Sequence, residues 1–505
     1  MKKTLLGVMI VTLLAGAIGA YAQGPGISSL PGGGWWEASQ VMNVGDDIAH
    51  TILTPIVGLD VSGVSAEPAS ADIEVGASHT FMPGMYGDMI MDDGFKGSAI
   101  VSSDQPIVAI GSIANNLIGD LGVSGGRAAA QYPGISQDAV DTTLAFPLVK
   151  NDYKGKTTTF YIQTVEAGTI YVTYSMNEGA DTYTASATTT EDGQMATFSP
   201  DDIATMPSGC SDATCLGAAT FTSTVELAGI YVEHNTVDSP AQILLSTRGF
   251  TPNDFDTTVV IPGVKSVWKG RTTGIQIMNV GDATSTITFT LSYQSGSASG
   301  ADGKSVVFTN VAKDASVTYF PGNHTADDTL LGPFGGGPYD EFLGAAIITS
   351  DQPMVAICNE NDFAGASVTK QTVYAGFAQS AATDTVLFPL VKEFYGNNQT
   401  GMQIMNVGDD PVTLEADYVL NTGSFTVDVD AGGATITVDP GAPFTLWGVT
   451  DWRPEWALYK GGFGAVTVRA SGSGDVLIVG IASEAEYPAG SKGYLDTKNY
   501  EGFNQ

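Results

Sequence analysis

The chain has 505 residues, a formal net charge of −34 and only 15% charged residues. Such an acidic surface repels the phosphate backbone, so we exclude nucleic acid as a partner. Because charges are sparse and apolar residues make up 43% of the chain, the composition also excludes a disordered acidic tail. The 62 glycines favour short strands that are joined by tight turns.

The N-terminus has the pattern of a cleavable secretory signal. Lys2 and Lys3 precede an apolar run over residues 5–18, and the small-residue exit Ala20-Tyr21-Ala22 follows. This run is shorter than the roughly 20 residues that a membrane helix needs. We therefore expect cleavage after residue 22 and no membrane span in the mature chain. The expected location is secreted, extracellular or at the cell surface, and the periplasm is compatible with the same signal.

A short motif, Met-Asn-Val-Gly-Asp after one aliphatic residue, recurs along the chain. Its copies are residues 41–46, 277–282 and 404–409. Apolar residues alternate with polar ones after two of the copies, over 287–293 and 412–418. That period of two predicts a strand with one wet face. We interpret the motif as a turn in which glycine takes a positive φ and Asn or Asp bonds the local backbone.

Two further landmarks recur in a fixed order around this motif. An entry strand precedes it, at 141–150, 256–265 and 384–392, with the shorter 29–32 at the start of the mature chain. A predicted hairpin with Asp-Gln-Pro at its tip follows it, at 99–110 and 346–357, with diverged copies at Asp238-Ser239-Pro240 and 475–477. We therefore predict a signal peptide (1–22) and four repeats, which are repeat 1 (23–138), repeat 2 (139–253), repeat 3 (254–381) and repeat 4 (382–505).

Each repeat has the size of an independently stable domain and lacks an amphipathic helix. The expected fold is all-β, with four tandem antiparallel β-sandwich modules of immunoglobulin-like type. The arrangement resembles the tandem immunoglobulin-like repeats of bacterial surface-layer, sheath and adhesin proteins, over the whole mature chain but without a specific family. The resemblance implies a structural or surface role and transfers no functional residue.

One loop that differs between the repeats is the strongest candidate site. In repeat 4 it gathers three tryptophans and two charged residues, namely Trp447, Asp451, Trp452, Arg453 and Trp456. Exposed tryptophans stack on sugars or anchor protein interfaces, and they also pack as a small core of their own. All three alternatives stay open for this loop. Trp35 and Trp36 at the opening of repeat 1 are a similar but weaker candidate, and Trp268 at the equivalent place in repeat 3 suggests a structural role for them.

The three cysteines suggest one small staple. Cys210 and Cys215 bracket four residues and could form a disulfide in an oxidising compartment. Cys358 lies inside an apolar run, where we expect a buried, inert thiol.

The residues that carry chemistry are scattered, so we predict no enzymatic activity. The four histidines, at 50, 79, 234 and 324, show no zinc spacing and no evident Cys or carboxylate companion. The Gly-x-Ser-x-Gly pattern at 122–126 lacks the strand and helix that a nucleophile elbow needs. Acidic pairs such as Asp46-Asp47 and Asp409-Asp410 could hold calcium, but a full Asp-x-Asp-x-Asp-Gly loop is missing. No other cofactor is expected.

The leading hypothesis is a secreted, non-enzymatic building block of an extracellular layer, sheath, filament or matrix. Its expected partners are further copies of itself or other cell-surface components. The alternative is an adhesin or carbohydrate-binding protein that uses the variable loops to bind glycans. A donor-strand role for the N-terminal arm is disfavoured, because residues 24–34 are rich in Gly and Pro and lack an alternating apolar strand.

Overall fold

The structure is a computed structural model of the chain. It describes residues 7–11, 30, 35–82, 90–92, 94–114, 128–235, 243–296, 299–320, 341–364, 367–396, 398–428, 436–447, 461–486 and 496–505. Within these ranges the regular structure consists of antiparallel β-strands and short 3-10 turns. The all-β prediction is therefore confirmed. No helix in the described ranges has the length and hydropathy to cross a membrane.

The chain divides into two compact units, Met1–Asn253 and Asp254–Gln505. In unit 1 the first sheet has the order β4 (Ala69–Ile73), β3 (Ala49–Val57), β6 (Gly97–Ser103), β1 (Gly7–Val11), β9 (Ile135–Ser136). The second has the order β5 (Ser78–Phe81), β2 (Trp36–Asn43), β7 (Ile107–Ala114), β8 (Ala129–Pro133). The third runs β13 (Asp181–Thr188), β12 (Thr169–Met176), β15 (Leu216–Asn235), β11 (Lys156–Thr164), β14 (Met195–Phe198), with β10 (Asp141–Lys150) and β16 (Leu244–Arg248) also paired to β15.

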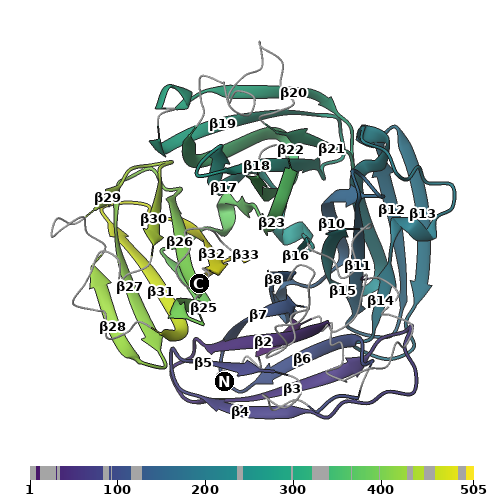
Figure 1. Ribbon diagram of the computed structural model, residues 1–505, viewed down its shortest axis with the longest axis horizontal. Helices are drawn as coiled ribbons and strands as arrows, with labels where there is room; N and C mark the ends of the chain where they lie inside the picture. Colours follow the sequence, from purple (N-terminus) through teal and green to yellow (C-terminus); the bar gives the residue numbers. More distant parts are fainter. Residues whose placement is uncertain are drawn as a thin grey trace. The chain divides into compact units, whose positions relative to one another are not determined.

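Unit 2 holds two further sheets (Figure 1). One runs β20 (Ser305–Val311), β19 (Ser285–Gly296), β22 (Phe342–Ala364), β17 (Asp256–Ser266), β24 (Phe377–Ala378), with β18 (Arg271–Asn279), β21 (Ser316–Tyr319) and β23 (Ser367–Ala375) attached. The other runs β28 (Gly423–Asp428), β27 (Val412–Leu420), β31 (Gly462–Gly472), β25 (Thr385–Tyr395), β26 (Asn398–Asn406), β32 (Ile478–Glu486), β33 (Asp496–Glu501), with β29 (Thr437–Val438), β30 (Pro443–Trp447) and β34 (Phe503–Asn504) attached. Strands β10, β17 and β25 confirm the three full-length entry strands.

The predicted Asp-Gln-Pro hairpin is wrong, because this segment is a corner between two layers. In repeat 3 the segment lies inside the single long strand β22. Before the corner β22 pairs with β17 and β19, and after it with β18 and β23. In repeat 2 the corner falls near Val225 of β15, whose N–H donates to Ser223 Oγ at 3.2 Å. The proposed equivalent Asp238-Ser239-Pro240 was therefore misplaced, and it lies outside the described residues.

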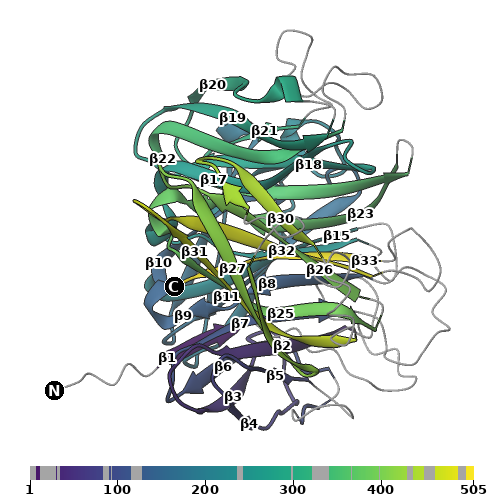
Figure 2. The same cartoon turned by 90° about the vertical axis from the view of Figure 1, so that its left-hand side faces the viewer.

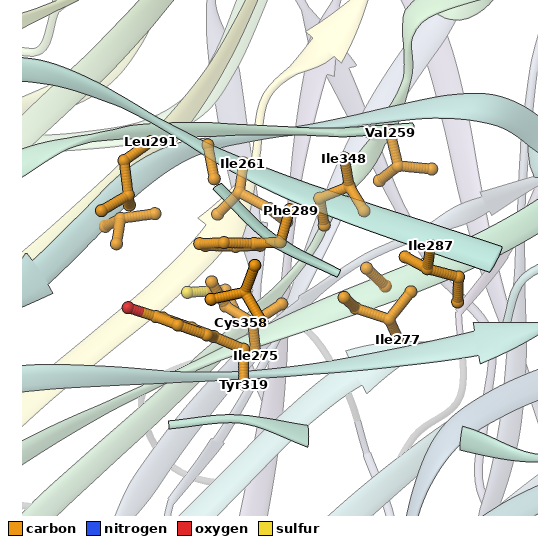
Figure 3. Packing of buried hydrophobic residues seen from close by; sticks show 14 of the residues in the cluster. Val259, Ile261, Ile275, Ile277, Ile287, Phe289, Leu291, Tyr319, Ile348 and Cys358 are labelled. Atoms are coloured by element: carbon orange, nitrogen blue, oxygen red, sulfur yellow. The ribbon is translucent and has the colours of Figure 1, made fainter. Parts of the chain in front are cut away.

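Because β22 crosses from one layer to the other, repeat 3 folds as a sandwich around one apolar core (Figure 3). Phe289 of β19 stacks on Tyr319 of β21, with ring centroids 4.2 Å apart. Cys358 is fully buried beside them, as expected, and burial raises the pKa of its thiol to about 12. The alternating burial of β19 and β27 confirms the predicted strands with one wet face.

The recurring motif is held by its asparagine side chain. Asn279 Nδ2 donates to the carbonyls of Ala283 and Val311, and its Oδ1 accepts from the N–H of Gly281 at 3.0 Å. Asn43 and Asn406 make the same bonds in repeats 1 and 4.

The predicted positive φ for the motif glycine is wrong. Gly45, Gly281 and Gly408 do not have positive φ values. Glycine is needed for another reason: a Cβ on Gly281 would lie 2.7 Å from Gln352 Cβ, in the corner segment. The motif and the corner are thus packed against each other, which explains why they recur together.

Candidate binding pocket

A pocket of about 340 Å³ lies in unit 2, where the strands of repeats 3 and 4 meet. Its walls come from the segment that joins β17 to β18, from β19 and β22, and from the repeat 4 strands β26, β30 and β32. The lining residues are Lys265, Trp268, Lys269, Arg271, Gln294, Ser295, Leu343, Gly401, Met402, Gln403, Thr445, Ile481 and Ser483.

The aromatic and basic wall comes from the turn between β17 and β18. Val267 and Lys269 adopt positive φ values of 50° and 51° on either side of Trp268. In this tight turn, the Lys269 ammonium lies 5.6 Å from the centroid of the Trp268 ring. Lys265 and Arg271 precede and follow the turn. Within the seven residues 265–271, the chain thus offers one aromatic face and three basic side chains, although the protein as a whole is strongly acidic.

Two of these cations are held by a buried carboxylate. Arg271 Nη1 donates to Glu360 Oε1 at 2.7 Å, and Lys265 Nζ donates to the other oxygen. Burial opposes ionisation of Glu360, but the charges of Lys265 and Arg271 outweigh it and lower the pKa of the carboxyl. The carboxylate therefore stays ionised and holds the two basic side chains at the pocket wall.

Another part of the wall is a cluster of amide and hydroxyl groups. Gln403 Nε2 donates to Gln294 Oε1 at 3.0 Å, and Gln294 Nε2 donates to Thr445 Oγ1 at 3.1 Å. Gln294 belongs to repeat 3, whereas Gln403 and Thr445 belong to repeat 4. This network fixes the pocket's shape and presents donors and acceptors of the kind that bind sugar hydroxyls.

The buried carboxylate with its two cations has counterparts in other repeats. In repeat 4, Lys392 and Lys498 each lie 2.9 Å from an oxygen of Glu484. In repeat 2, Lys150 lies 2.7 Å from Glu233, and Lys156 lies 4.0 Å from it. The lysine of the entry strand is thus a repeated scaffold element.

The tryptophan-rich loop predicted as a site lies largely outside the described residues. Asp451, Trp452, Arg453 and Trp456 fall in the undescribed segment 448–460. The backbone of Trp447 ends β30 and pairs with Gly401 of β26. Since Gly401 and Thr445 both line the pocket, the loop leaves a strand that forms part of the pocket wall.

Sequence reasoning missed the pocket itself. Trp268 was noticed only as a sign of a structural role, and Gln294 and Gln403 were not singled out. A signal existed for Gln403, because Gln40, Gln276 and Gln403 stand at the same place before each motif. Gln276 contacts Ser316 and Thr318 within its own repeat. The sequence around Gln403 gives no indication that its side chain contacts Gln294 of another repeat.

Cys210 and Cys215 form a disulfide, with Cα atoms 5.7 Å apart. It closes the short segment before β15, where the N–H of Lys154 also donates to the carbonyl of Cys210 at 3.1 Å. The bond therefore staples a surface turn of repeat 2.

The expectation that no histidine has a carboxylate companion is wrong for His50. Its Nδ1 lies 2.7 Å from Asp72 Oδ1, directly across strands β3 and β4. The hydrogen bond to Asp72 raises the pKa of His50. Both side chains are exposed, so the contact is a surface cross-strand pair. Residues 122–126 and His324 lie outside the described ranges.

Within the described ranges, no group of three or more His, Cys, Asp or Glu side chains is arranged to hold a metal ion. The calcium hypothesis stays a prediction, and no ligand set can be named for it.

The chain was also compared with known proteins. No protein-family model matches it, and no curated protein is significantly similar to it. Among solved structures, the crystal structure of Thermotoga maritima 1070 matches 24% of this chain and 95% of its own, with 13% sequence identity and a TM-score of 0.19.

Proposed function

We propose that this chain is a secreted, non-enzymatic structural or cell-surface protein that serves as a building block of an extracellular layer, sheath, filament or matrix. In this proposal a cleaved signal peptide precedes four tandem immunoglobulin-like sandwiches. Their partners are further copies or other surface components. The observation that carries the proposal is the apolar contact between neighbouring sandwiches within one compact unit.

The contact is clearest in unit 2. Ile481 of repeat 4 belongs to the buried apolar cluster of repeat 3. A second cluster combines Val260 and Ala345 of repeat 3 with Met405 and Val479 of repeat 4. Sandwiches that are joined only by a flexible linker would not share buried side chains. A rigid pair holds its outer faces at fixed angles, which is what a repeating assembly requires.

In unit 1 the two sandwiches are joined by hydrogen bonds between their residues. The N–H of Leu59 in repeat 1 donates to the carbonyl of Met195 in repeat 2 at 2.8 Å. The buried hydroxyl of Ser98 donates to the carbonyl of Gly193 at 2.5 Å. These contacts support the same reading, in which adjacent sandwiches form stiff pairs.

The test is the assembly state of the purified chain that begins at residue 23. We expect concentration-dependent oligomers in sedimentation velocity, and regular sheets or filaments in negative-stain microscopy. Both measurements are repeated with calcium and with a chelator. A chain that stays strictly monomeric at high concentration under both conditions would contradict the proposal.

The second candidate is an adhesin or carbohydrate-binding protein, and the pocket beside Trp268 favours it. An aromatic face, fixed cations and a wall of amides suit a sugar that bears a carboxylate. The test is glycan-array binding of the mature chain, of Trp268→Ala and of the triple variant W447A/W452A/W456A. Tyr171→Ala, an exposed aromatic on β12, is the matched control. We expect the pocket or loop variants to lose binding that the control keeps, and equal binding by all four proteins would rule this candidate out.

A further inference from the structure

The first sandwich of unit 1 includes a strand, β1, that comes from the predicted signal peptide. Strand β1 lies between β6 and β9 (Figure 2). Met9 pairs with Val101 of β6, and Ile10 pairs with Ile135 of β9. These residues belong to the predicted signal peptide and not to the mature part of repeat 1.

Strand β1 occupies the position that the entry strand fills in the other repeats, in the same register. In repeat 3, Val259 pairs with Ile348, and Val260 with Phe377. In repeat 4, Val386 pairs with Val468, and Leu387 with Phe503. In repeat 2, Leu144 pairs with Phe221, and Ala145 with Phe250. Repeat 1 therefore has a slot for an entry strand, and in this structure residues 7–11 occupy it.

Strand β1 is described as far as Val11, which by register stands where Ile261 and Phe388 stand, directly before the proline of the other entry strands. Strands β17 and β25 continue past their proline, and a buried tyrosine binds the backbone of the part that follows the proline. Tyr374 donates its hydroxyl to the carbonyl of Gly263 at 2.7 Å, and Tyr500 to that of Leu390 at 2.6 Å. In repeat 1 the equivalent Tyr132 donates to the buried carboxylate of Glu37 instead.

Repeat 1 also has a buried carboxylate near this position, that of Glu37, to which Tyr132 donates. In repeats 3 and 4 the acid that binds the entry-strand lysine is Glu360 or Glu484, which pairs across the sheet with Thr273 or Thr400. Repeat 1 has Glu37 at the threonine position, paired with Ile113. The buried carboxylate is thus kept beside the slot, on the neighbouring strand.

The arm that remains after cleavage is a poor replacement. If Leu30-Pro31 is aligned with the Phe-Pro of the other entry strands, Ser28 falls where Leu144, Val259 and Val386 are buried. The arm also contains Gly24, Pro25 and Gly26, which weaken a strand. A serine at a core position cannot supply the apolar contact that the slot provides for.

We propose that repeat 1 is a strand acceptor: once residues 1–22 are removed, the slot between β6 and β9 binds an extended strand from another polypeptide. This inference rests on the proposed export of the chain. The chemistry of the strand follows from repeats 2 to 4, with large apolar residues at two alternate positions and a lysine four residues after the second. In this arrangement the backbone of the bound strand completes the sheet on both sides.

The experiment uses a labelled peptide of residues 384–392, Asp-Thr-Val-Leu-Phe-Pro-Leu-Val-Lys, and two proteins, the chain 23–505 and the full-length chain. We expect the peptide to bind the chain 23–505 with a Kd at least about tenfold lower than for the full-length chain, whose slot β1 fills. Binding should raise the melting temperature of the chain 23–505. A peptide with Val386→Asp and Phe388→Asp is the matched control and should not bind.

A fused variant keeps the test decisive if the chain 23–505 folds poorly. In this variant the peptide sequence is joined to residue 23 through a flexible linker. We expect the fused protein to fold and not to bind added labelled peptide, because its own strand fills the slot. Binding that appears only after residues 23–29 are also removed would assign the slot to the chain's own arm and overturn the proposal. Mass spectrometry that finds residues 1–22 on the exported protein would overturn it as well. Peptide binding is measured on individual chains and does not require them to assemble. Its outcome is therefore independent of the sedimentation test.

Discussion

Replacing Glu484 with alanine should destabilise the sandwich of repeat 4 by about 3–5 kcal/mol, because a buried ion pair that loses one partner leaves uncompensated charge. The carboxylate is 2% exposed and contacts both Lys392 and Lys498 at 2.9 Å. Hydrogen exchange of β32 and β33 in the intact chain would measure the loss. The variant Lys313→Ala is the control: its pair with Asp282 is exposed, so losing that pair should leave hydrogen exchange close to that of the parent chain.

The same carboxylate predicts a pH dependence. Burial opposes its ionisation, but Lys392 and Lys498 outweigh burial and lower its pKa to about 2. An unfolded glutamate titrates at about 4.3, so the stabilisation is fully present above that pH and is lost as the pH falls towards 2. Glu484→Gln should remove this part of the acid sensitivity. An unchanged pH profile in that variant would contradict the assignment.

Ile481→Asp should uncouple the two sandwiches of unit 2. Ile481 lies on β32 of repeat 4 but packs in the core cluster of repeat 3, at 4% exposure. A carboxylate there would be buried among apolar side chains, at a cost of several kcal/mol. We expect hydrogen-exchange protection to fall along the contact between the repeats and regular assemblies to be lost. The measurements are exchange mass spectrometry and negative-stain microscopy.

Val307→Asp is the matched control for this second variant, because Val307 is 55% exposed on β20. It adds the same charge to unit 2 without burying it, so protection and assembly should stay as in the parent chain. If Ile481→Asp behaves like this control, the shared apolar cluster does not hold the two sandwiches together.

Local sequence pattern was sufficient for the strands of the fold. The entry strand 256–265 became β17, and the alternation after the motif became the half-buried β19. A strand's period of two is encoded by neighbouring residues, so it is visible without any tertiary information. The close Cys210 and Cys215 could be paired from sequence for the same reason, because a short loop limits their separation.

Features that depend on distant residues were misread or missed. The Asp-Gln-Pro segment has the composition of a turn, but whether a chain reverses or crosses to the facing sheet depends on which strands flank it. Gly281 was expected to need a positive φ, yet it is required by the side chain of Gln352, 71 positions further along the chain. The pocket was invisible because Gln294 and Gln403 meet only through the packing of two repeats.

Residue order along single strands therefore determines that this chain is all-β and which face of several strands is buried, because alternating burial is a local property. Only the tertiary structure decides which strands share a layer, where repeats join and which slots are filled. Those outcomes depend on contacts between segments that are far apart in the chain. The clearest case is repeat 1, where strand β1 comes from residues 7–11, a segment whose sequence indicates only an export signal.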